Sequence, residues 1–146
     1  MNEADTQNVA ACTCANLRKA TRVVTQVYDA ALQPVGLKAT QFTVLAVLAE
    51  RGEAPLTRLA ETLVMDRTTL TRNLKPLVRE GFIRIEPGVD ARVRQVSLTP
   101  AGRDVFDAAL PHWQAVQRRI AERLGLERWS GLLDDLSATV DVTSAG

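Results

Sequence analysis

Apolar residues recur three and four positions apart along the first half of the chain, which is the spacing of a helix with one buried face. The first such helix is predicted over residues 8–32. Residues 40–50 are apolar on nearly every side and indicate a buried helix, with Thr40 as its N-cap and Gly52 as its end. After a turn or short strand, a further short helix is predicted over residues 56–63. The first half of the chain is therefore expected to be largely helical.

The second half combines helices with two strand-like runs. A helix is predicted over residues 67–80, after Asp66, whose side chain is of a type that caps helix N-termini. Pro76 lies inside this helix and is expected to kink it. Strands are predicted at 82–86 and 93–98, and the turn-forming letters PGVDAR between them indicate a hairpin with an exposed tip.

Two more helices are predicted at the end of the chain. Thr99 is a suitable N-cap for a helix that runs to about Leu124, bends at Pro111 and is broken by Gly125. The last helix carries one apolar stripe, made of Trp129, Leu132, Leu133, Leu136 and Val140. The first and last helices belong to no compact unit of their own, so a second copy of the chain is expected to help cover their stripes.

The order of these elements predicts a mainly α fold with a small β-hairpin wing, in a single domain over residues 1–146. Residues 37–102 are predicted to form a winged helix-turn-helix, which is a DNA-binding region. The segments 8–36 and 103–146 are predicted to be dimerisation helices, so we expect a homodimer.

The composition is that of a globular protein. Hydrophobic residues make up 46% of the chain and charged residues 24%, which are ordinary values. No apolar run approaches the about 18 residues that cross a bilayer. The polar, acidic N-terminal letters MNEADTQNVA do not form a secretory signal. We therefore expect a cytoplasmic protein without a membrane partner.

Charge is unevenly distributed, although the formal net charge is only +1. Between Arg67 and Arg94 there are seven basic and three acidic residues, whereas both flanking regions have a small excess of acid. A basic island in a nearly neutral chain is typical of a module that binds a polyanion, although a solvated basic surface has the same pattern.

One face of the helix predicted after Asp66 carries much of this charge. Leu70, Leu74 and Leu77 fall together on a helical wheel and predict the buried side. The opposite side has no acid before Glu80, whereas an ordinary solvated face usually mixes both charges. Arginine can bond two acceptors of guanine, lysine can neutralise phosphate, and threonine can bond phosphates or bases. The candidate DNA-binding residues of this helix are Arg67, Thr68, Thr69, Thr71, Arg72, Lys75 and Arg79.

Two stretches of the chain resemble the MarR family of bacterial transcription regulators, namely LTRLAETLVMDRTTLTRNLKPLVREGFIRI and DARVRQVSLTPAGR. The second stretch is similar to the wing signature of that family through Asp90, Arg92, Leu98, Thr99 and Gly102. The resemblance covers nearly the whole chain and implies a triangular dimer built from the terminal helices.

The same resemblance assigns roles in DNA binding. It implies that residues 67–79 read the major groove and that Arg92 or Arg94, on the wing, enters the minor groove. Asp90 is then expected to orient the arginine through a salt bridge, although simple turn chemistry is the alternative for this residue. An arginine on an exposed turn suits the negative potential of a narrow minor groove.

Cys12 and Cys14 allow several interpretations. Arg18 lies one helical turn after Cys14 and could favour a thiolate, as in a redox sensor, but both cysteines could equally be small structural residues. A metal site is not expected, because only His112 could add an imidazole and residues two apart on a helix point in different directions. The first helix also resembles that of the organic-hydroperoxide regulators of the MarR family. Cys14 and Tyr28 match their reactive cysteine and a tyrosine, whereas Arg18 replaces a second tyrosine.

A ligand cavity is the other candidate for receiving a signal. Members of the MarR family usually bind small aromatic effectors between the dimerisation helices and the DNA-binding block, so the resemblance implies a cavity there. The candidate lining residues are Arg22, Tyr28, Phe42, His112 and Trp113. The alternative is that Trp113 is packed in the core and His112 lies at the surface.

These patterns predict a sequence-specific DNA-binding transcriptional regulator. It is expected to be a dimeric repressor of a pseudo-palindromic double-stranded operator, released by a small aromatic ligand or an oxidant, with no cofactor. An enzyme is not expected, because the chain has no glycine-rich phosphate loop, paired-acid motif or nucleophile elbow. Two alternatives remain: a thiol-dependent enzyme with Cys14 as nucleophile and His112 as base, and a protein-interaction dimer that does not bind DNA.

Overall fold

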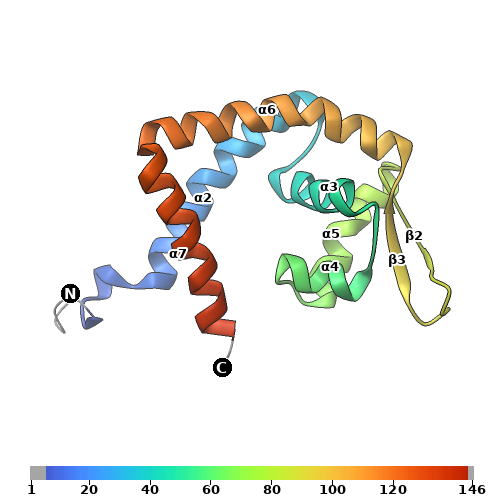
Figure 1. Cartoon of the computed structure of the whole chain (residues 1–146), viewed down its shortest axis with the longest axis horizontal. Helices are drawn as coiled ribbons and strands as arrows, with labels where there is room; N and C mark the ends of the chain where they lie inside the picture. Colours follow the sequence, from blue (N-terminus) through green and yellow to red (C-terminus); the bar gives the residue numbers. More distant parts are fainter. Residues whose placement is uncertain (1–5, 145–146) are drawn as a thin grey trace.

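Helices make up most of the chain in the computed structural model, which describes residues 6–144 (Figure 1). The helices, including two short 3-10 helices, are η1 (Val9–Ala11), α2 (Thr13–Leu32), η2 (Gln33–Val35), α3 (Ala39–Arg51), α4 (Leu56–Leu63), α5 (Arg67–Arg79), α6 (Pro100–Leu124) and α7 (Leu126–Ser144). The strands are β1 (Glu53–Pro55), β2 (Ile83–Pro87) and β3 (Arg94–Leu98). The predicted fold class, mainly α with a small β wing, is confirmed.

The strands form one antiparallel sheet in the order β1-β3-β2. The predicted hairpin pairs Ile83 with Leu98 at its base and Pro87 with Arg94 near its tip. The segment before α4, for which the sequence allowed a turn or a strand, is a strand that pairs Ala54 with Val96 on the other side of β3. Strand β3 is therefore paired along both edges, so β1 attaches the wing hairpin to the segment that precedes α4.

The long helix α6 connects two parts of the molecule. Figure 1 shows α3, α4, α5 and the sheet gathered beside the N-terminal end of α6, and α7 extending from its other end. The fully buried side chains lie mainly in the first part, and the largest of them are Leu32, Leu45, Leu48, Leu59, Leu70, Leu74 and Leu77. The first part therefore has its own hydrophobic core.

The second part leaves apolar surface exposed. No residue of α7 is buried in this chain. Its predicted stripe is partly open to solvent, with exposed fractions of 44% for Leu132, 43% for Leu133, 36% for Leu136 and 42% for Val140. The chain by itself therefore does not cover the apolar face of α7.

Helix boundaries agree with the predictions except at two starts. The helix predicted over residues 8–32 is interrupted at Cys12, whose Sγ accepts a hydrogen bond from the Ala15 backbone N–H at 3.5 Å. Helix α3 begins after Lys38, so the prediction of Thr40 as its N-cap was wrong. Two side chains fix this earlier start: Gln41 accepts a hydrogen bond from the Lys38 N–H at 2.8 Å, and Asp29 of α2 accepts one from the Ala39 N–H at 2.7 Å.

Two prolines lie inside continuous helices. Helix α5 continues through Pro76, and α6 continues through Pro111, so neither proline ends its helix. Within residues 6–144, no single helix is long and apolar enough to span a bilayer; the segments Thr13–Val35 and Ala39–Arg51, bent by 71°, meet that criterion only as a pair.

Candidate nucleic-acid interface

Asp66 fixes the start of helix α5. Its carboxylate accepts hydrogen bonds from the backbone N–H of Thr69 at 2.7 Å and from the Thr69 hydroxyl at 2.9 Å. The backbone bond, followed by the hydroxyl bond, holds the pKa of Asp66 below its ordinary value. The carboxylate is therefore charged at neutral pH and complements the positive end of the helix dipole.

Helix α5 presents the predicted face to solvent. Leu70, Leu74 and Leu77 are buried in the core, with exposed fractions of 1% or less. The exposed side forms an open hollow of about 520 Å³ lined by Arg67, Thr68, Thr71, Arg72 and Lys75. The ion pairs within residues 6–144 join Arg84 to Glu86 and Arg92 to Asp90, so none neutralises this face. The cations of α5 are available to an anionic partner.

Two threonines of α5 are engaged within the chain. The Thr69 hydroxyl donates to Asp66, and the Thr71 hydroxyl donates to the backbone carbonyl of Arg67 at 2.7 Å. Both side chains are exposed, but their hydroxyl protons are already used. The oxygen of each remains available as an acceptor, and the methyl group remains available for apolar contact.

The wing carries the predicted salt bridge, and Arg92 makes it. The Arg92 guanidinium donates to both carboxylate oxygens of Asp90 at 3.3 Å, and the Arg92 backbone N–H donates at 3.0 Å. Arg94 begins β3 and is exposed, without an ion pair among the described residues. The Arg92 side chain is 91% exposed, so the salt bridge orients the arginine without burying it.

Hydrogen bonding also sets the charge state of the wing. The Arg92 backbone N–H, and then its side chain, hold the pKa of Asp90 below the ordinary value of 3.8. The Asp90 carboxylate is therefore charged at any pH above its ordinary pKa. The ion pair with Arg92 is lost only when the pH falls through the lowered pKa of Asp90. The wing tip therefore keeps its geometry throughout the neutral range.

The predicted cavity residues divide into two groups. The first group is aromatic: the ring centroid of Phe42 lies 5.6 Å from that of Trp113, and the Tyr28 hydroxyl donates to the side-chain carbonyl of Gln117. Tyr28, Phe42 and Trp113 line a cavity of about 200 Å³ between α2, α3 and α6. Burial raises the pKa of Tyr28, so its hydroxyl is neutral and can donate.

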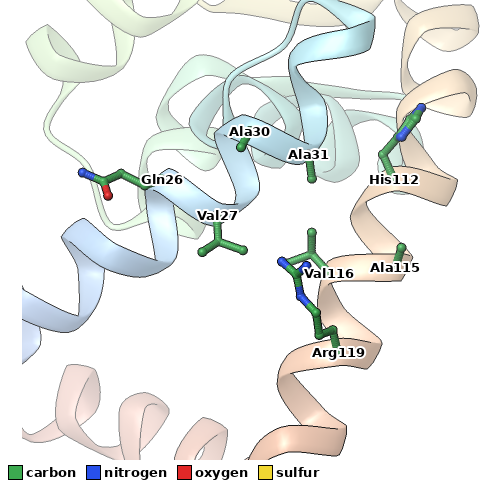
Figure 2. Close-up of a pocket in the computed structure, with 8 residues that line it drawn as sticks. All are labelled: Gln26, Val27, Ala30, Ala31, His112, Ala115, Val116 and Arg119. Carbon is green, nitrogen blue, oxygen red and sulfur yellow. The ribbon is translucent and has the colours of Figure 1, made fainter.

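His112 lies elsewhere, in an open hollow of about 550 Å³ between α2 and α6 that includes Val116 and Arg119. Figure 2 shows its ring turned away from the centre of that group. Adjacent helical residues are about 100° apart, so His112 and Trp113 cannot face the same cavity. Arg22 is exposed and lines neither space. In the single chain the five residues therefore do not share one cavity: Tyr28, Phe42 and Trp113 line one space, His112 lines another, and Arg22 lines neither.

The sequence did not single out two residues that contact the Tyr28, Phe42 and Trp113 side chains. The Phe106 ring stacks on Phe42 at a centroid distance of 5.4 Å, and Gln117 accepts the hydrogen bond of Tyr28. Phe106, Trp113 and Gln117 share one face of α6, at spacings of seven and four residues. That helical spacing is the signal that could have identified them.

The cysteines are free and exposed at the start of the first long helix. Cys12 caps α2, and Cys14 lies in its first turn, one turn before the exposed Arg18. Within residues 6–144, no group of three or more His, Cys, Asp and Glu side chains is placed to hold a metal ion. The two thiols are therefore accessible to small reagents.

Comparison with known proteins identifies the family. Residues 37–93 match the model of the MarR family. The HTH-type transcriptional regulator SarZ of Staphylococcus epidermidis is 30% identical over 110 residues, which cover 75% of this chain and 73% of SarZ.

Solved structures agree with this match. The M. tuberculosis transcriptional regulator MOSR, in complex with DNA, is 36% identical, with a TM-score of 0.85 over 92% of this chain and 97% of MOSR. A probable transcriptional regulator from Pseudomonas aeruginosa is 26% identical, with a TM-score of 0.81 over 90% of this chain and 99% of that protein. The chain thus belongs to the MarR family of winged-helix, DNA-binding transcription regulators.

Proposed function

We propose that the protein is a dimeric repressor that binds a pseudo-palindromic operator in double-stranded DNA and leaves it in response to a small molecule or an oxidant. It would act in the cytoplasm, where a bacterial chromosome is located. The observation that carries this proposal is the exposed face of α5, which has basic residues and threonines, no acid and no ion pair.

Helix α5 is proposed to enter the major groove. It has 13 residues, a well-formed N-terminus and an opposite side buried in the core, which are the requirements for a rigid reading helix. Arg67, Thr68 and Arg72 are proposed to reach base edges, since they lie in its first two turns. Lys75 and Arg79 are proposed to contact phosphates.

The wing is proposed to place Arg92 in the adjacent minor groove. A guanidinium that is almost fully exposed, and held in place by Asp90, matches the narrow and strongly negative groove of A·T-rich DNA. Arg94, at the start of β3, is proposed to contact the neighbouring phosphates. MOSR, a relative of 36% identity, has been solved in complex with DNA, which supports a DNA-binding role.

Dimerisation is proposed to involve the terminal helices. Leu132, Leu133 and Leu136 of α7 line one apolar hollow with Val24 of α2, which is 43% exposed. Contiguous apolar surface of this kind usually marks a protein interface. A two-fold dimer would present two copies of α5 to successive major grooves on one side of the DNA.

Selection from a pool of random double-stranded DNA tests this function. The purified protein is expected to enrich inverted half-sites with centres about 10–10.5 base pairs apart, one helical turn. Affinity for the enriched fragment is expected to fall steeply with salt. A pool that shows no common sequence after repeated rounds would support the protein-interaction alternative instead.

The signal has two candidate receivers, which lie toward opposite ends of α2. The aromatic cavity of Tyr28, Phe42 and Trp113 lies between the terminal helix α2, the core helix α3 and α6, so an aromatic ligand there could alter how these helices pack. The exposed Cys14 thiol could instead be oxidised by a hydroperoxide, which is reduced to an alcohol as the thiol becomes a sulfenic acid. Cys12 is then a candidate resolving thiol.

The oxidant alternative makes a direct prediction. Stoichiometric cumene hydroperoxide is expected to lower the affinity of the wild-type protein for its selected DNA, because oxidation adds a polar group where α2 begins. The Cys14→Ser variant is expected to bind equally well with and without the peroxide, whereas Cys12→Ser, which keeps Cys14 and lacks only the candidate resolving thiol, is expected still to respond. Equal responses of wild type and Cys14→Ser, measured by fluorescence anisotropy, would favour the aromatic cavity as the receiver.

A further inference from the structure

A single threonine joins the end of the reading helix to the start of the long helix. The Thr99 hydroxyl accepts a hydrogen bond from the Gly102 N–H at 3.0 Å, which caps α6, and donates one to the Gly81 carbonyl at 2.5 Å. The Thr99 backbone N–H donates to the Phe82 carbonyl at 3.1 Å. Gly81 and Phe82 follow α5 after its C-cap, Glu80, so one residue bonds both to α6 and to the loop that leaves α5.

Close packing reinforces this junction. Gly102 is buried in the first turn of α6, and a Cβ atom at its position would overlap the Phe82 carbonyl oxygen and lie 2.8 Å from Leu98 Cδ1. The backbone of α6 therefore rests directly on the loop that links α5 to β2. Any side chain larger than hydrogen would force the two elements apart.

The loop itself is firmly attached to α5. The Phe82 N–H donates to the Leu77 carbonyl at 2.9 Å, and the Gly81 N–H donates to the Val78 carbonyl at 3.0 Å. On the other side of the junction, the Arg103 side chain donates to the Ala49 carbonyl at the end of α3, at 3.0 Å. The start of α6 thus contacts both the C-terminal end of α3 and the loop that follows α5.

A small change of angle at this junction would displace the residues of α5 that are proposed to read bases. The junction holds the C-terminal end of α5, whereas the residues proposed to read bases lie at its N-terminal end. The 13 residues of α5 span about 20 Å, so a tilt of about 10° at the junction moves the first turn by about 3.5 Å. A hydrogen bond to a base edge does not survive such a displacement.

We infer that Thr99 and Gly102 are positioning residues for operator recognition. They hold α5 and the wing at one angle to α6, and through the dimer they set the separation of the two reading helices. Thr99 needs both of its hydroxyl hydrogen bonds for this role, one for the cap of α6 and one for Gly81. The inference rests on the proposed function, because it requires a dimer that reads two half-sites.

Variants of Thr99 separate the positioning role from helix capping. Thr99→Ser keeps both hydrogen bonds, Thr99→Val loses both, and Thr99→Asp keeps a good cap for α6 but cannot donate to Gly81. The Asp variant retains the cap, so it remains informative if the valine variant does not fold. Thr62→Val is the matched control, because the exposed Thr62 hydroxyl bonds only within α4, to the Arg58 carbonyl at 2.9 Å.

The experiment measures affinity for the DNA fragment selected by the wild-type protein, and for versions with one base pair added or removed between the half-sites. Thr99→Val and Thr99→Asp are expected to bind the selected fragment roughly three- to tenfold more weakly, the range expected for the hydrogen bond to Gly81 that both variants lose. Their preference for the original spacing is expected to fall as well. Thr99→Ser and Thr62→Val are expected to match the wild type.

The spacing preference decides the outcome. If Thr99→Asp keeps the wild-type affinity and spacing preference, or if the folded variants lose affinity equally for all spacings, Thr99 has no positioning role and the inference is wrong. Circular dichroism confirms beforehand which variants are folded. A wild-type protein that selects no DNA would instead contradict the proposed function, so the two failures are distinguishable.

Discussion

Replacing Leu132 with glutamate is expected to convert the protein to a monomer and to weaken operator binding by roughly 10²–10⁴-fold, the gain that two linked half-sites provide. Leu132 is 44% exposed in the isolated chain and belongs to the apolar stripe of α7. A glutamate in a two-fold interface appears twice and would be buried without a partner, which is strongly unfavourable. Light scattering measures the change, since the wild type should have twice the chain mass of 15.9 kDa.

Ala138→Glu is the matched control for this variant. Ala138 lies on the side of α7 opposite the stripe and is exposed, so the same charge is added to the same helix away from the expected interface. This variant is expected to remain dimeric and to bind the operator normally. A wild-type protein that is monomeric at micromolar concentration, or a dimeric Leu132→Glu variant, would contradict the assignment of α7 to the interface.

The second large effect is expected for Arg72→Ala, which should weaken operator binding by roughly 1–3 kcal/mol if Arg72 makes a bidentate contact to guanine. The side chain is exposed, lines the hollow of α5 and has no ion pair, so its removal should leave the fold unchanged. Selection repeated with the variant should show a relaxed base preference at one position of each half-site. Titration against the wild-type fragment measures the loss of affinity.

Two further variants show whether the loss reflects base reading. Arg72→Lys keeps the charge but lacks the fork that bonds two acceptors, so it should retain the salt dependence and lose the base preference. Arg92→Ala should lose affinity mainly for operators with A·T-rich flanks and keep the preference of α5. If Arg72→Ala and Arg92→Ala both bind like the wild type, these residues do not face DNA.

Much of the fold could be predicted from the sequence because its signals are local. The 3.6-residue spacing of Leu70, Leu74 and Leu77 is enough to define which side of α5 is buried and which is exposed. Asp66 as N-cap and the turn around Asp90 involve hydrogen bonds over two or three residues, so the letters themselves carry the information. The wing and the candidate reading face follow from these patterns.

The tertiary structure decided what depends on residues far apart in the chain. Tyr28 and its partner Gln117 are 89 positions apart, and Thr99 and Gly81 are 18 apart, so no local pattern reveals either hydrogen bond. The same holds for the Ala39 N–H at the start of α3, whose acceptor is Asp29 of another helix. Sequence alone therefore determined the elements and the charged face of this protein. The packing of α6 against α2 and α3, and against the loop after α5, decided which cavity each side chain enters and how the reading helix is held, because those choices depend on the angles at which helices meet.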